Sequence, residues 1–291
     1  MNNLDSEGEN IMKKVVVTGA GGYIGRYVIH ELCDQGYDVT AVDLRKKDWD
    51  SRAKFCPVPI FSGEADIYEQ LGKPDVCIHL AWRDGFVHNS PAHMDDLSKH
   101  IIFLRNMISG GLPLLTVMGT MHEIGYWEGA IDEHTPCNPM TQYGIAKNAL
   151  RQSLLLTAQN SQCKLHWLRA YYITSDDERG SNIFSKIVKA EKEGKRTFPF
   201  TTGKNKYDFI DIKELAKMIV AASVQDEVNG IINVCSGNPI SLSEEVESFI
   251  KEHGYNIKLQ YGVFPERAYD SPAEWGDNKK ITCIMKKTNL L

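Results

Sequence analysis

Residues 13–25 read Lys-Lys-Val-Val-Val-Thr-Gly-Ala-Gly-Gly-Tyr-Ile-Gly. The valine-rich run Lys13–Thr18 ends at a glycine, which predicts a buried strand. The segment Tyr23–Gln35 has the apolar period of a helix and is followed by Gly36, a residue that commonly ends one. A strand, a glycine-rich turn and a helix in this order predict the first βα unit of a parallel sheet.

Three glycines spaced Gly-x-x-Gly-x-x-Gly directly follow that strand and open that helix. Gly19 permits a tight turn, Gly22 lets the backbone approach a pyrophosphate, and Gly25 lets the helix pack on the strand. The start of the helix, at Tyr23 and Ile24, then faces the phosphates. The turn is therefore predicted to bind a dinucleotide cofactor, NAD or NADP.

Apolar runs alternate with helical patterns through the first half of the chain, as in successive βαβ units. The predicted fold is α/β: a Rossmann-type, doubly wound parallel sheet with a smaller, interleaved C-terminal substrate domain. The pattern loosens after residue 170, and the segment from Pro265 shows no clear period. Further strands are predicted over 38–42, 55–61, 76–81, 112–118 and 164–170, and further helices over 94–109 and 141–158.

The domain organisation follows from these patterns. Residues 1–12 are polar and are expected to form a flexible tail. Residues 13–170 are expected to form the NAD(P)-binding domain, and 171–291 mainly the substrate-binding domain. Segments within about 206–235 are expected to return to the first domain.

Composition excludes several classes of protein. A net charge of −5 over 291 residues gives no electrostatic basis for binding nucleic acid or an anionic membrane. No apolar run approaches the roughly 18 residues of a membrane span. The seven cysteines occur singly, which predicts reduced thiols in a cytoplasmic protein. No metal site is predicted, because His122-Glu123 is followed by Tyr126 where a zinc motif needs a second histidine.

Asp43 ends the second predicted strand. A carboxylate at this place accepts a hydrogen bond from the adenine ribose 2′-hydroxyl, which favours NAD. Arg45 and the two lysines after it are the opposing observation, because they could accommodate the 2′-phosphate of NADP. Both cofactors therefore stay open, with NAD favoured.

Tyr143 and Lys147 are four residues apart in a predicted helix, so their side chains share one face. An ammonium close to a phenol favours the phenolate and is expected to lower the tyrosine pKa. A tyrosine tuned in this way can exchange a proton with a sugar or alcohol oxygen. Beside a nicotinamide, that proton transfer becomes half of a hydride-transfer reaction.

These motifs together resemble the extended short-chain dehydrogenase/reductase family, which comprises nucleotide-sugar epimerases, dehydratases and reductases. The resemblance runs from about Lys13 to Asp277 and rests on the glycine turn, His79-Leu80-Ala81, Thr120 and the Tyr143–Lys147 pair. It implies that Leu80 and Ala81 lie at the cofactor. It also implies that Thr120 hydrogen-bonds the reacting oxygen, Tyr143 is the acid/base, and Lys147 holds the nicotinamide ribose.

One departure from the family pattern narrows the reaction. The 4,6-dehydratases carry an Asp-Glu pair directly after the Ser or Thr, where this chain has Met121 and His122. Methionine cannot transfer a proton, so dehydration is disfavoured. His122 is either an auxiliary acid/base or substrate hydrogen bonder, or a partly buried histidine bonded to the backbone.

Four residues are predicted to contact a nucleotide-sugar substrate. The resemblance implies that Asn182 contacts the phosphates and that Arg267 clamps the pyrophosphate, for which a planar guanidinium is suited. A solvated surface arginine is the alternative for Arg267. Trp82 and Arg83 follow Ala81 and are predicted to line the cleft, the alternative being an ordinary rim of the core.

The leading functional hypothesis is NAD(P)-dependent reduction of a 4-keto-6-deoxy sugar nucleotide, with hydride transfer to C4 and Tyr143 as proton donor. A nucleotide-sugar 4-epimerase using the same three residues is the alternative. A non-catalytic dinucleotide sensor or scaffold is disfavoured by the complete Thr120, Tyr143 and Lys147 set. The resemblance further implies a homodimer formed through the helices over 94–109 and 141–158.

Overall fold

A sheet of seven parallel strands forms the centre of the computed structural model, which describes residues 12–265 and 270–288. The strand order confirms the predicted doubly wound Rossmann-type sheet, because the chain runs outward from β1 in both directions. The crevice where the order reverses lies between β1 and β4. From one edge to the other the strands are β11 (Gly230–Val234), β7 (Lys164–Ala170), β5 (Leu114–Thr120), β4 (Val76–His79), β1 (Lys14–Thr18), β2 (Asp38–Val42) and β3 (Lys54–Cys56).

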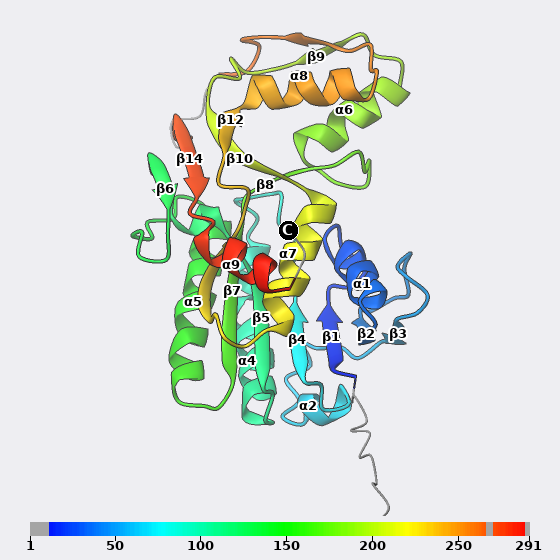
Figure 1. Ribbon diagram of the computed structural model, residues 1–291, viewed down its shortest axis with the longest axis vertical. Helices are drawn as coiled ribbons and strands as arrows, with labels where there is room; N and C mark the ends of the chain where they lie inside the picture. The colour runs from blue at the N-terminus through cyan, green and yellow to red at the C-terminus, as the bar shows by residue number, and fades with distance from the viewer. Residues whose placement is uncertain (1–11, 266–269, 289–291) are drawn as a thin grey trace, which may run out of the picture.

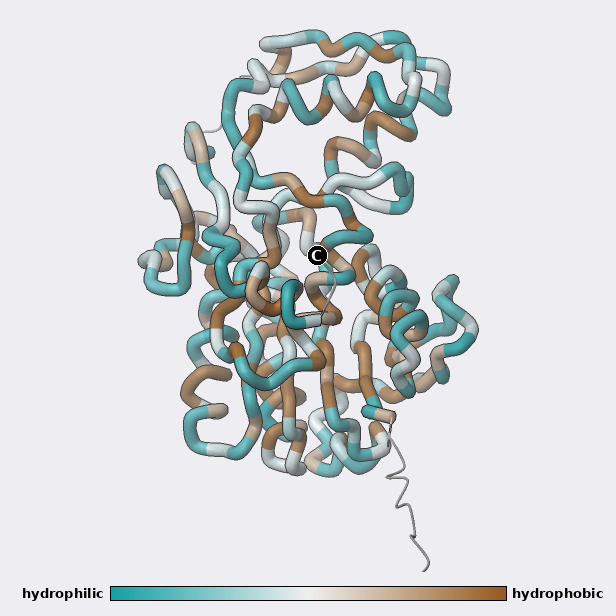
Figure 2. Tube along the Cα trace, in the orientation of Figure 1, coloured by the Kyte–Doolittle hydropathy of each residue, from teal (hydrophilic) through white to brown (hydrophobic). Residues whose placement is uncertain are grey.

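Helices cover both faces of this sheet (Figure 1). Val15 and Val17 of β1 point into a core shared with α1 (Gly25–Asp34), α7 (Ile212–Val224) and α9 (Lys279–Lys287). Val16 points to the opposite core, which it shares with α2 (Ile67–Gln70), α4 (Leu97–Ser109) and α5 (Gln142–Gln159). The strands are apolar on both faces for this reason, and Figure 2 shows them as largely hydrophobic segments inside more polar helices.

A small lobe lies above the carboxyl ends of these strands (Figure 1). Phe184, Phe200, Phe209 and Phe249 are buried in its separate core. The lobe contains α6 (Ile183–Lys192), α8 (Leu242–Glu252), the pair β9 (Thr197–Pro199) and β13 (Lys258–Gln260), and β10 (Lys206–Asp211). β10 also joins it to a mixed sheet with β8 (Tyr172–Thr174), β12 (Pro239–Ser241), β14 (Ala273–Gly276) and β6 (Gly129–Ile131).

The chain returns to the large sheet after it enters the small lobe. β11 pairs with β7 at the sheet edge, and α7 packs against α1. α9 packs against α7 and β11 of the large domain. It lies beyond residues 206–235, the range in which the sequence predicts a return to that domain. The predicted tail over 1–12 falls outside the described residues except for Met12. In the part of the chain that is described, no helix is long and apolar enough to cross a membrane.

Several predicted elements differ from the structure. The strand expected over 55–61 ends at Cys56, because Pro57 and Pro59 cannot continue a hydrogen-bonded ladder. The helix expected over 94–109 is two helices, α3 (Ala92–Asp95) and α4, with Asp96 between them. The segment after Pro265 contains β14 and α9 despite its lack of a clear period.

A buried carboxylate ties the segment that enters the small lobe to the large domain. Asp177 forms an ion pair with Arg26 of α1 at 3.2 Å and accepts a hydrogen bond from the hydroxyl of Tyr27 at 3.1 Å. Arg179 donates to the same carboxylate from Nε at 2.9 Å. Burial opposes ionisation of Asp177, but the hydrogen bonds from Arg179 and the charge of Arg26 lower its pKa to about 2.

We therefore expect Asp177→Asn to lower the free energy of unfolding by about 2 kcal/mol at neutral pH, measured by urea unfolding. A depressed folded-state pKa stabilises the protein above the ordinary value of 3.8, and that stability is lost as the pH falls toward about 2. The deficit of the variant should therefore shrink over this range. The exposed neighbour Asp176, changed to Asn, is the control, and an equal deficit in both variants would contradict the prediction.

Candidate active site

The glycine turn brings the ends of β1 and β4 into direct contact. Gly19 has φ +70°, and a Cβ there would lie 2.6 Å from the backbone nitrogen of Ala81. Leu80 is held beside the same turn by its N–H bond to the Thr18 carbonyl at 3.1 Å. A Cβ on Gly25 would overlap the Gly19 carbonyl oxygen, so α1 can start at this place only from a glycine. The structure thus brings together Gly19, Gly22, Tyr23, Ile24, Gly25, Leu80 and Ala81 at the sheet crevice.

Asp43 lies at the end of β2 beside this turn. Its Oδ2 accepts a hydrogen bond from the Gly21 N–H at 3.1 Å and lies 3.5 Å from Nζ of Lys47. Lys47 is the basic residue of this loop that forms an ion pair with Asp43, and Arg45 is exposed. A carboxylate fixed against the turn fits the ribose of a dinucleotide whose phosphates lie at the start of α1.

The three predicted catalytic residues meet at the carboxyl end of β5. Thr120 is the last residue of β5, and its side chain hydrogen-bonds that of Tyr143 on α5. Nζ of Lys147 lies 5.9 Å from the centre of the Tyr143 ring and donates to the Met118 carbonyl at 2.7 Å. The indole of Trp82 covers the same ammonium at 3.8 Å.

Burial controls the proton affinities of this group. It lowers the pKa of Lys147 to about 7, because an ammonium away from water is disfavoured. It raises the pKa of Tyr143 above its ordinary value, although the hydrogen bond from Thr120 opposes the shift. The tyrosine pKa is therefore raised, contrary to the sequence prediction, and Lys147 is not among the groups that shift it.

Histidines surround Tyr143. The ring of His88 stacks on it at 5.6 Å, that of His93 lies 5.2 Å away, and that of His122 lies 6.2 Å away. The His88 carbonyl also accepts the Tyr143 N–H at 2.9 Å. His122 therefore lies within the site, beside the rings of His88 and Tyr143.

The residues that the sequence predicts to contact substrate do not all lie at the site. The indole nitrogen of Trp82 donates to His93 at 3.0 Å, so Trp82 belongs to the site. Arg83 is exposed and forms an ion pair with Asp96 at 2.9 Å. Asn182 caps α6 and donates to the hydroxyl of Tyr23 at 3.1 Å, which joins the small lobe to the glycine turn. Arg267 lies outside the described residues.

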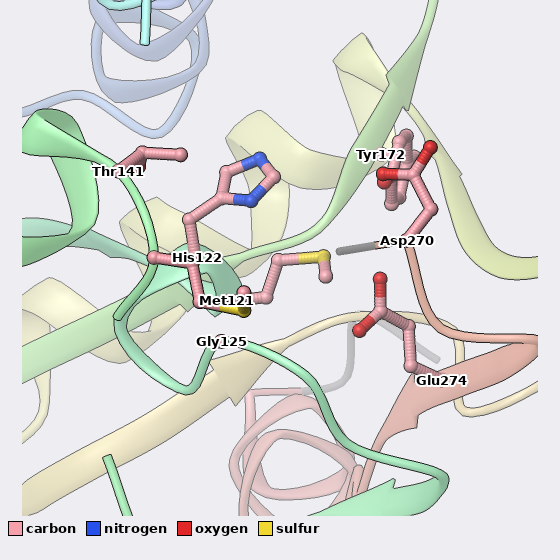
Figure 3. Close-up of a pocket in the computed structure, with 8 residues that line it drawn as sticks. Met121, His122, Gly125, Thr141, Tyr172, Asp270 and Glu274 are labelled. Atoms are coloured by element: carbon pink, nitrogen blue, oxygen red, sulfur yellow. The ribbon is translucent and has the colours of Figure 1, made fainter. Parts of the chain in front are cut away.

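A small pocket beside the catalytic group contains acidic residues that the sequence did not indicate. Figure 3 shows His122 on one side of this pocket, with Tyr172, Asp270 and Glu274 on the other. Burial raises the pKa of Glu274 to about 8, so this carboxyl can donate as well as accept a hydrogen bond near neutral pH. Nothing in the local sequence marks Glu274, because it reaches the pocket through the pairing of β14 with β6 and β10.

Glu123 is a second residue that sequence reasoning missed. Its carboxylate is fully buried directly behind Thr120 and accepts the Thr120 N–H at 2.9 Å. The signal was present, because Thr-Met-His-Glu over 120–123 is the capping-box pattern in which residue i+3 accepts from the cap backbone.

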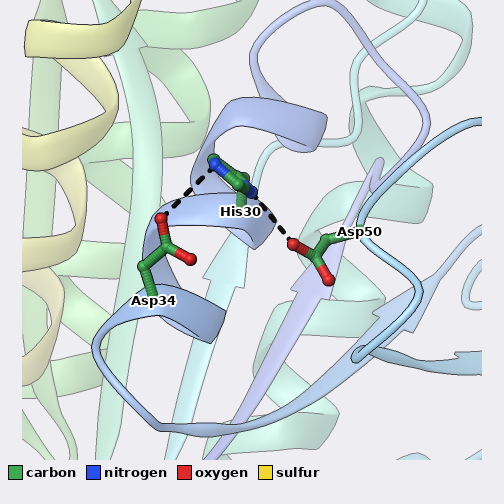
Figure 4. Close-up of side chains that lie close together, drawn as sticks. All are labelled: His30, Asp34 and Asp50. Carbon is green, nitrogen blue, oxygen red and sulfur yellow. Dashed lines mark hydrogen bonds and ion pairs between the residues drawn. The ribbon is translucent and has the colours of Figure 1, made fainter.

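One exposed cluster has ligand types suited to a metal. His30 lies between Asp34 and Asp50, at 3.3 Å and 2.9 Å (Figure 4). Arg52 forms ion pairs with both carboxylates, so their charge is already compensated. This group is therefore explained as a surface ion-pair network without a metal.

The chain belongs to the NAD dependent epimerase/dehydratase family, whose model matches residues 15–235. It is 45% identical over 270 residues to the dTDP-6-deoxy-L-talose 4-dehydrogenase (NAD(+)) of Aggregatibacter actinomycetemcomitans, over 90% of this chain and 98% of the relative. It is thus an NAD-dependent enzyme that processes nucleotide sugars.

Solved structures show the same fold at low identity. The UDP-N-acetylglucosamine 4-epimerase of Methanobrevibacter ruminantium has a TM-score of 0.82 at 18% identity, over 94% of this chain and 92% of that chain. The Thermus thermophilus UDP-glucose 4-epimerase in complex with NAD has a TM-score of 0.77 at 17% identity, over 93% and 92%.

Burial of the Lys147 ammonium is expected to destabilise the folded protein. We expect Lys147→Met to raise the melting temperature, and to raise it more at about pH 6 than at about pH 9. Between the folded-state pKa of about 7 and the ordinary 10.5, the unfolded chain binds the extra proton, so stability of the native protein rises with pH. The desolvation cost that the variant removes is therefore largest below pH 7.

Scanning calorimetry at both pH values checks this expectation, with the exposed Lys258→Met as the control. A fall in melting temperature of equal size at both pH values would show that the ammonium is not the source of the instability.

Proposed function

We propose that the enzyme interconverts dTDP-6-deoxy-L-talose and the corresponding 4-keto-6-deoxy sugar nucleotide with NAD as cofactor. The observation that supports this most is the 45% identity to a protein of that activity over nearly its whole length, together with Thr120, Tyr143 and Lys147 at one site. Met121 in place of a dehydratase carboxylate is consistent with an oxidation or reduction at C4 that removes no water.

The proposed chemistry balances as one hydride and one proton. In the reductive direction the C4 carbonyl carbon gains a hydride, and its oxygen gains the proton of the Tyr143 hydroxyl. In the oxidative direction the C4–H bond breaks, the hydride leaves to the cofactor, and Tyr143 receives the hydroxyl proton. When bound, NADH would supply the hydride in the reductive direction, and NAD⁺ would accept it in the oxidative direction.

The surrounding residues would orient these groups. Thr120 would hydrogen-bond the reacting oxygen beside Tyr143, and Lys147 would exchange the Met118 carbonyl for the nicotinamide ribose. The glycine turn and Asp43 would hold the phosphates and the adenine ribose. Trp82 and the pocket of His122 and Glu274 would face the sugar.

Absorbance of reduced nicotinamide tests the activity directly. Purified protein is mixed with dTDP-6-deoxy-L-talose and either NAD⁺ or NADP⁺, and with NADH or NADPH and a panel of nucleotide-linked 4-keto-6-deoxy sugars. Stoichiometric oxidation or reduction with a dTDP sugar is the expected result. No absorbance change with any member of the panel would contradict the proposal.

The alternative is a 4-epimerase, which the solved structures of that activity favour by fold. There Tyr143 would remove the hydroxyl proton first, and the keto intermediate would rotate and take the hydride back on its other face. A cofactor retained through purification and sugar turnover without net change of the nicotinamide would establish this alternative.

We expect Tyr143→Phe to reduce turnover by about 10²-fold or more while leaving the dissociation constant for NAD unchanged, because only the proton donor is lost. Initial rates and a cofactor titration measure the two quantities. Tyr261→Phe, an exposed tyrosine of the small lobe, should behave as the wild type. Wild-type turnover in Tyr143→Phe would exclude the assigned role.

We expect Asp43→Ser to lower kcat/KM with NAD by about 10-fold, because one charge-assisted hydrogen bond is lost. The same change should raise the preference for NADP, since Lys47 would no longer be paired with a carboxylate. The ratio of kcat/KM values for the two cofactors measures this effect. Asp48→Ser in the same loop is the matched control, and equal ratios in the two variants would argue against ribose recognition by Asp43.

A further inference from the structure

Thr120 is held from behind by a buried carboxylate. Glu123 ends the short η1 turn (Met121–Glu123), and its Oε1 accepts the Thr120 N–H and the indole N–H of Trp167, both at 2.9 Å. Glu123 and Trp167 are fully buried. The backbone of Thr120 therefore has one position relative to β7, while its hydroxyl is left to accept the His122 N–H at 3.2 Å and to bond to Tyr143.

The space for this contact depends on a glycine. A Cβ on Gly119 would lie 2.7 Å from Oε1 of Glu123 and would overlap the indole nitrogen of Trp167. Gly119 is paired with Arg169 on the neighbouring strand, so the turn closes directly over β7. The strand end is thus built around the carboxylate.

Two guanidinium groups compensate the charge of Glu123. The Nε atoms of Arg169 and Arg151 each lie 3.4 Å from its Oε2. Arg169 is fully buried and also donates to the Asp132 carbonyl at 2.8 Å. Arg151 belongs to α5, where Tyr143, Lys147 and Arg151 follow one another at intervals of four residues and so share one helix face.

We infer that Glu123 is the positioning residue of the acid–base site: it fixes Thr120 through the backbone and ties η1 to the catalytic face of α5 through Arg151. The inference rests on the proposed function in so far as Tyr143 is the proton donor. The carboxylate itself is fully buried behind Thr120 and would touch neither cofactor nor substrate.

The charges around Tyr143 give the direction of the effect. After burial and the bond from Thr120, the negative charge of Glu123 acts to raise the pKa of Tyr143, and it also opposes the lowering of the Lys147 pKa. Lys147 from α5, His122 from η1, His93 from α3 and His88 from the loop after β4 are the other titratable groups near the Tyr143 ring.

Removal of the Glu123 charge leaves Arg151 and Arg169 uncompensated. Positive charge then favours the tyrosinate form of Tyr143 and the neutral form of Lys147, so both groups lose their protons at lower pH.

Two variants of Glu123 separate charge from geometry. Glu123→Gln keeps the length and an oxygen for Thr120 and Trp167 but removes the charge. We expect the alkaline limb of the reductive rate–pH profile to move to lower pH by about half a unit or more. Glu123→Asp keeps the charge but is too short to reach both donors. We expect it to lower kcat by about 10-fold and to leave the alkaline limb in place.

Asp208→Asn is the matched control, because Asp208 is also a fully buried carboxylate with backbone N–H donors, and it is not among the charges that act on Tyr143. The alkaline limb of the rate–pH profile of Asp208→Asn should lie at the same pH as that of the wild type. An unchanged limb in Glu123→Gln, or the same loss of kcat in both Glu123 variants without a difference in pH profile, would overturn the inference.

A second readout does not depend on turnover. Near-ultraviolet absorbance follows tyrosinate formation in the NAD⁺ complex, and subtraction of the matching Tyr143→Phe protein isolates Tyr143. Tyr143 should ionise at lower pH in Glu123→Gln than in the wild type. If no sugar nucleotide is oxidised or reduced, the proposed function fails, whereas the absence of a shift in this titration overturns the inference on Glu123 even when no turnover can be measured.

Discussion

The parallel pairing of β1, β4 and β5 is the constraint on which the site depends. It brings the carboxyl ends of these strands to one edge, where the glycine turn, Ala81 and Thr120 all lie. The contact between Gly19 and Ala81 leaves no room for a side chain, so the cofactor turn and the wall of the reaction site have one relative position. α5 then adds Tyr143 and Lys147 from the face of the sheet that carries Val16.

Local patterns predicted the parts that local physics determines. The βα unit at the glycine turn and the strands 38–42 and 164–170 were readable from the sequence. The spacing of Tyr143 and Lys147 predicted that they share one helix face, whereas Thr120 was assigned to the same site by the family resemblance. The α/β class and the membership of the family are confirmed by the sheet order and the family match.

The remaining features depend on contacts between distant segments. Glu274 reaches the pocket only because β14 pairs with β6 and β10, and no pattern near residue 274 reports this. The direction of the Tyr143 pKa was missed because spacing gives the position of Lys147 but not how completely both groups are removed from water. For Glu123 a local pattern was present, because Thr-x-x-Glu is typical of a helix cap. Its role behind Thr120 becomes evident only from its contacts with Trp167 and Arg169, which lie on a distant strand.

The link between Asn182 and Tyr23 has a thermodynamic consequence. The amide of Asn182 bonds to the tyrosine at the start of α1, and Asp177 is bonded to the next turn of the same helix. The lobe that would hold the sugar is therefore anchored on the helix that would hold the cofactor phosphates. Any ligand that alters the geometry of the Tyr23 hydroxyl changes the free energy of the lobe, and by reciprocity any ligand that moves the lobe changes the affinity of the turn. Cooperative binding of two ligands can thus arise from contacts as few as these between the lobe and α1.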